Sequence, residues 1–119
     1  MATEMSVEWR YQDGGGASSA PVKVDYAATR STLREQLLRG FFGPPKGGVF
    51  SASLQATIYD LGCLVLSALP AVASISIDTP NIHMIPFTQL KNLTSESFAD
   101  DVYVATSEPA GTIHCTVSR

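Results

Sequence analysis

The sequence predicts a two-layer α+β domain, with an antiparallel β-sheet and two helices packed on one of its faces. Two segments carry apolar residues at helical spacing, and several shorter segments alternate apolar with polar residues. The predicted order of elements is β-α-α-β-β-β-β. A chain of 119 residues forms one domain at most, and a hydrophobic content of 45% supplies one modest core. We therefore expect residues 1–119 to fold as a single domain.

Each predicted helix has a recognisable start and stop. Asp25 can cap the first helix, and Gly43-Pro44-Pro45 ends it. Ser51 or Ser53 can cap the second helix, and Pro70 ends it. The apolar stripes consist of Tyr26, Leu33, Leu37 and Phe41 in the first helix and Leu54, Ile58, Leu61, Val65 and Leu69 in the second.

The predicted strands are short, and several have one apolar face. They cover residues 7–11, 73–77, 84–87, 102–106 and 113–117. Residues 13–21 are rich in Gly, Ser and Ala and are predicted to form a flexible loop, and residues 91–100 a polar loop. The first strand has no hairpin partner before it, so we expect an open sheet edge that pairs with a neighbouring chain or with a segment missing upstream.

Composition excludes several classes of function. The net charge of −3 comes from 8 basic and 11 acidic residues and gives no basic footprint for nucleic acid. The longest apolar run, residues 61–72, is too short to span a membrane and is interrupted by Pro70. Cys63 and Cys115 have neither metal-ligand spacing nor the density of a disulfide scaffold. We expect no metal site, and buried free thiols in a reducing compartment.

A polar pair marks the junction between two predicted strands. Asn81 and His83 are two residues apart in an extended segment that follows Pro80, so their side chains are expected on the same face. An amide that both donates and accepts, beside a group that titrates near neutral pH, is typical of a site for a small polar ligand. The alternative is an ordinary hydrogen-bonded Asn and His at a strand junction.

A second polar feature lies at the start of the second predicted helix. Gln55 falls in the first turn, where backbone N–H groups have no intrahelical acceptor. The N–H of Leu54 and the amide of Gln55 can both face a ligand that carries carbonyls and ring N–H groups, and the helix dipole favours a partly anionic one. The alternative is a solvated glutamine.

Several segments, in the same order and spacing, resemble urate oxidase (uricase). Residues 51–59, SASLQATIY, are similar to the segment that starts a helix in that family, and residues 79–83, TPNIH, resemble its Pro-Asn-Lys-His turn. Residues 102–106, VYVAT, and 109–117, PAGTIHCTV, look like its closing strands, and residues 8–11, EWRY, like the strand that opens its second half. The resemblance covers nearly the whole chain and places it in the carboxy-terminal half of the family.

The resemblance implies a T-fold domain and a reaction. Uricases contain two tandem T-fold domains and form homotetramers with active sites between subunits, so a homo-oligomer or a complementary uricase half is the expected partner. The implied reaction oxidises urate with O₂, the co-substrate, to 5-hydroxyisourate and hydrogen peroxide, without metal or organic cofactor. The family also implies a peroxisomal location, although the chain ends in Val117-Ser118-Arg119 and not in a peroxisomal tripeptide; otherwise we expect a cytoplasmic one.

The resemblance also assigns roles to four residues. Gln55 holds the purine through its side-chain amide, and Leu54 through its backbone N–H. Asn81 positions dioxygen, or the water that attacks later, above the ring plane. His83 takes part in the proton relay beside that position.

Some uricase features have no counterpart in this sequence. The family's other domain supplies a Lys–Thr pair, and the arginine that binds urate falls before the segment matching residues 7–11. We therefore expect at most weak activity from the chain alone. Two alternatives stand beside a uricase half: a non-catalytic T-fold remnant or oligomerising subunit, and a binder of a pterin or another purine.

Overall fold

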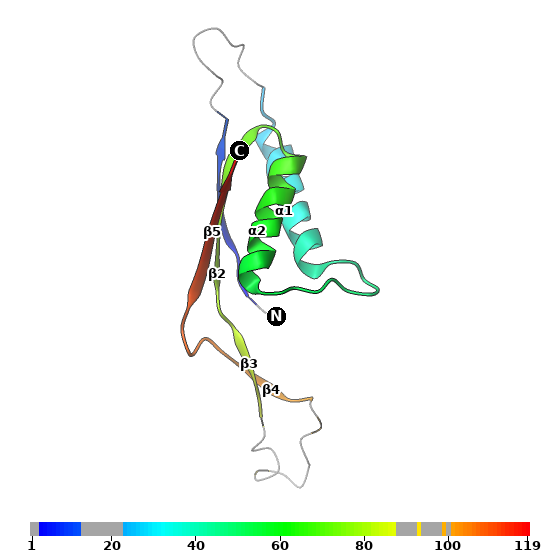
Figure 1. Cartoon of the computed structure of the whole chain (residues 1–119), viewed down its shortest axis with the longest axis vertical. Coiled ribbons are helices and arrows are strands. Elements are labelled where there is room, and N and C mark those ends of the chain that lie inside the picture. Colours follow the sequence, from blue (N-terminus) through cyan, green and yellow to red (C-terminus); the bar gives the residue numbers. More distant parts are fainter. Residues whose placement is uncertain (1–2, 13–22, 88–92, 94–98, 100) are drawn as a thin grey trace.

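The computed structural model describes residues 3–12, 23–87, 93, 99 and 101–119. The elements follow the predicted order (Figure 1). They are β1 (Ser6–Tyr11), α1 (Tyr26–Phe42), α2 (Leu54–Ala68), β2 (Val72–Pro80), β3 (His83–Pro86), β4 (Tyr103–Thr106) and β5 (Thr112–Ser118). The predicted loop at residues 13–21 lies outside the described residues, as does nearly all of the loop at 91–100.

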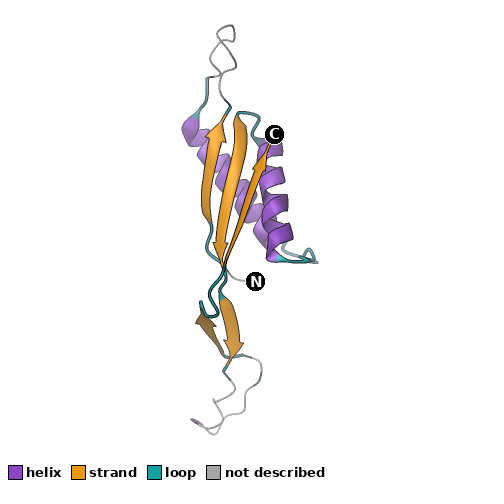
Figure 2. Cartoon of the chain, turned by 60° about the vertical axis from the view of Figure 1, so that its left-hand side comes forward, coloured by secondary structure: helices purple, strands orange, loops and turns teal. Residues whose placement is uncertain are grey.

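A three-stranded sheet has the order β1-β2-β5, and both of its strand pairs are antiparallel. Ile77 of β2 lies opposite Val7 of β1 on one side and Cys115 of β5 on the other. Both helices cover the same face of this sheet (Figure 2). The predicted α+β class, with two helices on one side of an antiparallel sheet, is confirmed.

The remaining strands form a second sheet that the sequence did not predict. Strands β3 and β4 pair with each other in antiparallel fashion, with His83 opposite Thr106 and Pro86 opposite Tyr103. This pair lies beyond the end of the three-stranded sheet (Figure 2). The junction of β2 and β3 is therefore a boundary between two sheets, and the predicted site residues Asn81 and His83 lie at that boundary.

The predicted helix ends are confirmed by their capping contacts. The Asp25 carboxylate accepts from the Ala28 N–H at 2.9 Å, and Gly43 closes α1 with a φ of 64°. Of the two serines proposed for α2, Ser53 is the cap, because its hydroxyl oxygen accepts from the Ala56 N–H at 3.1 Å. These local contacts fix where each helix begins, and for α2 they place Leu54 and Gln55 in the first turn.

The core lies between the helices and the covered face of the sheet. Its buried hydrophobic residues are Leu33, Leu37, Ile58, Leu61, Val65, Leu66, Val72, Ile75 and Ile77. Helix α2 lies close to the sheet at Gly62, where an added Cβ would come within 2.6 Å of Val117 Cγ2. One predicted stripe residue differs: Tyr26 is 66% exposed, and its ring contacts Tyr11 edge-on at 5.1 Å between centroids.

Both cysteines are free, as predicted, but they are half-buried instead of fully buried. Cys63 lies on α2 and Cys115 on β5, and these two elements pack against each other. Neither helix of the described chain is long and apolar enough to cross a membrane.

Candidate functional site

Asn81 lies between β2 and β3, in contact with a turn that precedes β5. Its backbone N–H donates to the carbonyl oxygen of Gly111 at 2.8 Å. Its side chain lies beside the same residue, because a Cβ added at Gly111 would come within 3.2 Å of the Asn81 amide nitrogen. Gly111 therefore leaves the space that the half-buried amide of Asn81 occupies.

His83, the first residue of β3, contacts the same turn. Its Nε2 atom lies 3.3 Å from the carbonyl oxygen of Pro109, and the residue is half-buried. The structure thus brings Asn81 and His83 to one turn, residues 109–111, although the sequence placed them together only by their spacing.

Two threonines hold the segment before Asn81 in place. Thr79 is fully buried, and its hydroxyl donates to the carbonyl oxygen of Ile113 on β5 at 3.1 Å. The hydroxyl of Thr3 donates to the carbonyl oxygen of Pro80 at 2.7 Å. These two hydrogen bonds, each from a threonine hydroxyl to a main-chain carbonyl, hold the end of β2 just before the polar pair begins.

Leu54 and Gln55 are the first two residues of α2. The Ser53 carbonyl accepts from the Thr57 N–H at 3.1 Å, and the Ser53 side chain accepts from the Ala56 N–H, so the intrahelical pattern leaves the N–H groups of Leu54 and Gln55 without acceptors. The Leu54 side chain packs against the core, whereas Gln55 is exposed. Two backbone donors and one amide side chain are thus available at this helix start.

The two polar pairs lie toward the same end of the three-stranded sheet. Helix α2 begins near the end of the sheet from which β2 continues into β3 (Figure 1). No hydrogen bond joins Leu54 or Gln55 to Asn81 or His83 within the described part of the chain. Whether one ligand contacts both pairs belongs to the proposal below.

On the uncovered face of the sheet, four polar side chains are linked by hydrogen bonds. The sequence analysis did not single them out. His114 Nδ1 lies 2.8 Å from a carboxylate oxygen of Asp78, and His114 Nε2 lies 3.0 Å from the Thr116 hydroxyl. The Ser76 hydroxyl lies 2.8 Å from that of Thr116. The sequence feature that could have indicated this group is the alternation of polar residues along β2 and β5, which places these side chains on one face of the sheet.

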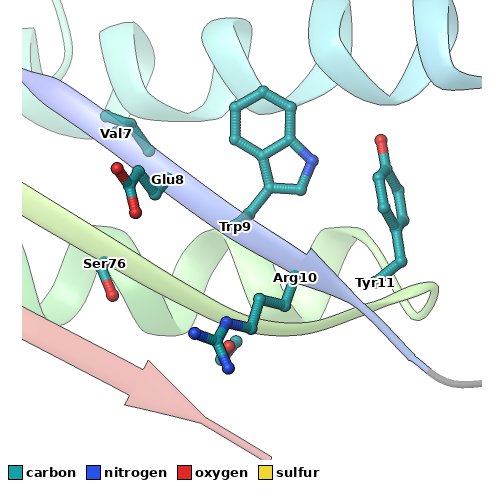
Figure 3. Close-up of a pocket in the computed structure, with 7 residues that line it drawn as sticks. Val7, Glu8, Trp9, Arg10, Tyr11 and Ser76 are labelled. Carbon is teal, nitrogen blue, oxygen red and sulfur yellow. The ribbon is translucent and has the colours of Figure 1, made fainter.

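Strand β1 borders a shallow hollow of about 520 Å³. The side chains of Trp9 and Tyr11 leave one side of the strand and that of Arg10 leaves the other (Figure 3). None of the four predicted site residues lines this hollow. Among the described residues, no three His, Cys, Asp or Glu side chains are grouped so that they could hold a metal ion.

The pKa is raised for two side chains, Tyr59 on α2 and Cys115 on β5. A hydrogen bond with Cys63 is the main cause that raises the pKa of Tyr59. Burial, and then the nearby Cys63, raise the pKa of the Cys115 thiol. Both shifts favour the protonated, neutral form, so neither group is an activated nucleophile.

Comparison with known proteins decides the family. The family model described as uricase matches residues 1–114. The chain belongs to the uricase family. It is 38% identical over 121 residues to a uricase of Arabidopsis thaliana and 36% identical over 124 residues to uricase-2 isozyme 1 of Glycine max. Each alignment covers 100% of this chain and 39% of the relative, so the chain spans about two fifths of the length of these uricases.

Solved uricase structures share the fold. The crystal structure of uricase from Arthrobacter globiformis superimposes with a TM-score of 0.75 at 27% identity, over 98% of this chain and 36% of that one. This similarity confirms the T-fold predicted from the family resemblance.

Proposed function

We propose that this chain supplies part of the active site of a uricase, which oxidises urate with O₂ to 5-hydroxyisourate and hydrogen peroxide in purine catabolism. One observation carries the proposal. In a chain of the uricase family, Asn81 and His83 lie against a single turn, at the end of the sheet where α2 begins. A residue with a donor–acceptor amide and a residue with an imidazole thereby contact the same turn.

Two of the four predicted residues would bind the purine, and the other two would act at the position of dioxygen. The N–H of Leu54 and the amide of Gln55 would hydrogen-bond to urate in the plane of its rings, and Gln55 is exposed as this role requires. Asn81 would hold dioxygen, and later the attacking water, above that plane. His83 would accept and return the proton that moves during the reaction.

The proposed chemistry needs no metal or organic cofactor. Deprotonated urate is a flat anion whose charge is delocalised, so it can pass electrons to O₂ directly. The protein would supply orientation, a base and a site that excludes water. The helix start at Leu54 suits this substrate, because the positive end of a helix dipole stabilises an anion.

The proposed working form is an assembly. The chain spans 39% of the length of its plant relatives, so we propose that it acts with a complementary uricase half and within a homo-oligomer. The sheet supports this, because β1 and β5 are its outer strands and each pairs with only β2 among the described strands. A peroxisomal location rests on the family resemblance and would be tested by imaging the tagged protein in cells.

The test compares the purified chain alone with the chain mixed with a complementary uricase half. We expect the mixture to bleach the ultraviolet absorbance of urate and release an equimolar amount of peroxide, and the chain alone to do so weakly at most. A mixture that associates but leaves urate intact would contradict the proposal and favour an oligomerising, non-catalytic subunit. Binding of a pterin in preference to urate would contradict it in favour of a different ligand.

A further inference from the structure

The turn at residues 109–111 contacts both residues of the proposed oxygen-side pair. Gly111 accepts the Asn81 N–H at 2.8 Å, and the Pro109 carbonyl oxygen lies 3.3 Å from His83 Nε2. One short turn thus contacts the main chain of Asn81 and the imidazole of His83, so a displacement of the turn affects both contacts.

The contact with Pro109 determines which nitrogen of His83 carries the hydrogen. A carbonyl oxygen only accepts hydrogen bonds, so Nε2 must be the donor. In a neutral imidazole the other nitrogen, Nδ1, then keeps its lone pair. Within the described part of the chain, Nδ1 of His83 has no hydrogen-bond partner.

The second histidine provides an internal contrast. Nδ1 of His114 faces the Asp78 carboxylate at 2.8 Å, and an ionised carboxylate only accepts. His114 must therefore carry a hydrogen on Nδ1, and in the neutral ring this leaves Nε2 to accept from the Thr116 hydroxyl at 3.0 Å. When both rings are neutral, the contacts of the 2 histidines thus require opposite tautomers.

The contact with Gly111 limits the volume beside Asn81. A methyl group at this position would lie 3.2 Å from the Asn81 amide nitrogen, which is closer than ordinary van der Waals contact. Ala110, the neighbouring residue, is exposed. An atom added at Gly111 therefore displaces the amide, whereas an atom added at Ala110 extends into solvent.

We infer that the turn at residues 109–111 is the positioning element of the site, and that it orients His83 so that Nδ1 is the atom that accepts a proton. Pro109 and Gly111 act through His83 and Asn81 and are positioning residues. The proton would leave urate or the attacking water for Nδ1, while the hydrogen on Nε2 stays on that nitrogen and remains hydrogen-bonded to the Pro109 carbonyl oxygen. The role of Nδ1 in turnover rests on the proposed function, whereas the tautomer does not.

The first experiment reads the tautomers by nuclear magnetic resonance of the full chain with isotope-labelled histidine, at a pH where both rings are neutral. His114→Gln assigns the two ring systems. We expect His83 to carry its hydrogen on Nε2 and His114 on Nδ1. A hydrogen on Nδ1 of His83, or the mixture of tautomers shown by free histidine, would overturn the inference.

The second experiment tests the turn itself with a matched pair of variants, Gly111→Ala and Ala110→Ser, each of which adds one heavy atom. Gly111→Ala should move the His83 ring signals toward those of free histidine, and Ala110→Ser should leave them unchanged. Equal signals in both variants and in the unmodified chain would overturn the positioning role. Circular dichroism confirms that each variant is folded.

The third experiment measures urate turnover in the assembled protein. Gly111→Ala should lower kcat at least about tenfold, since small misplacements of reacting groups are costly, with KM changed by less than about twofold. A raised KM with unchanged kcat would overturn the inference. If the unmodified assembly has no activity, the proposed function fails, and the tautomer measurement still decides the inference about the turn.

Discussion

The backbone N–H of Asn81 donates to the carbonyl oxygen of Gly111 at 2.8 Å, so the turn holds Asn81 by its main chain. The side-chain amide can therefore be removed without breaking the contact that fixes the segment. This separation of anchor and functional group makes the residue suitable for a decisive substitution.

Asn81→Ala should abolish most urate oxidation and leave the fold intact. Loss of one oriented polar group at a reacting centre typically lowers kcat about 10² to 10³-fold. The free energy of unfolding should change by less than about 1 kcal/mol, because the main-chain hydrogen bond remains. Steady-state kinetics of the assembled protein and urea unfolding measure the two quantities. Full activity in the variant would remove Asn81 from the site.

Ser53→Ala should destabilise the chain by about 1 kcal/mol, because the Ala56 N–H loses the side chain that accepts it at 3.1 Å. Ser67→Ala, on the same helix, is the matched control. The Ser67 hydroxyl bonds back to the carbonyl of Cys63, a contact that does not support helices, so its loss should be nearly neutral. Equal unfolding midpoints for the two variants would show that Ser53 does not set the start of α2.

Gly62→Ala should destabilise the packing of α2 on the sheet by roughly 1–2 kcal/mol. Overpacking a core costs about 1–3 kcal/mol, and the better helix propensity of alanine returns at most about 1 kcal/mol. The added methyl group would meet Val117 Cγ2 at 2.6 Å. Combining it with Val117→Ala should therefore cost less than the sum of the two single changes in urea unfolding. Strict additivity would contradict this contact.

The Cys115 thiol should react slowly with iodoacetamide at neutral pH. Burial raises its pKa, so a smaller fraction is thiolate than in an exposed cysteine. The reaction rate should rise with pH, and its midpoint should lie above that of a free cysteine. Mass spectrometry of Cys63→Ser isolates the reaction of Cys115, and burial keeps the shift upward in this variant. A midpoint at or below that of free cysteine would contradict the packing of β5 against α2.

Local chemistry explains what could be predicted from the sequence. The caps at Asp25, Gly43 and Ser53 each depend on contacts within three or four residues, so the helix ends were predicted correctly. The strand predicted at residues 73–77 is longer in the structure, as β2 runs from Val72 to Pro80. The extension depends on pairing with β5, as far as Pro80 opposite Thr112, and single-sequence alternation carries no information about that partner.

The candidate site also depends on long-range contacts that a single sequence does not reveal. The spacing of Asn81 and His83 predicted a polar pair, and the structure brings both residues to one turn. The turn begins 26 residues beyond His83, and its sequence, Pro109-Ala110-Gly111, is typical of a turn but does not indicate which residues the turn contacts. The division of the strands into two sheets, which places this pair at a boundary, also depends on long-range pairing. Neither the contacts of the turn nor the division into two sheets has a local signal in the sequence.

The most direct test of the proposed uricase site replaces each of the chain's 2 histidines in the assembled protein and measures urate consumption together with peroxide release. His83→Ala should lower kcat/KM at least about a hundredfold, the range expected for loss of a proton-transfer group. His114→Ala, which removes the exposed pair with Asp78, should retain most of the activity. Full activity in His83→Ala, or an equal loss in both variants, would contradict the assignment of the site to the turn that holds Asn81 and His83.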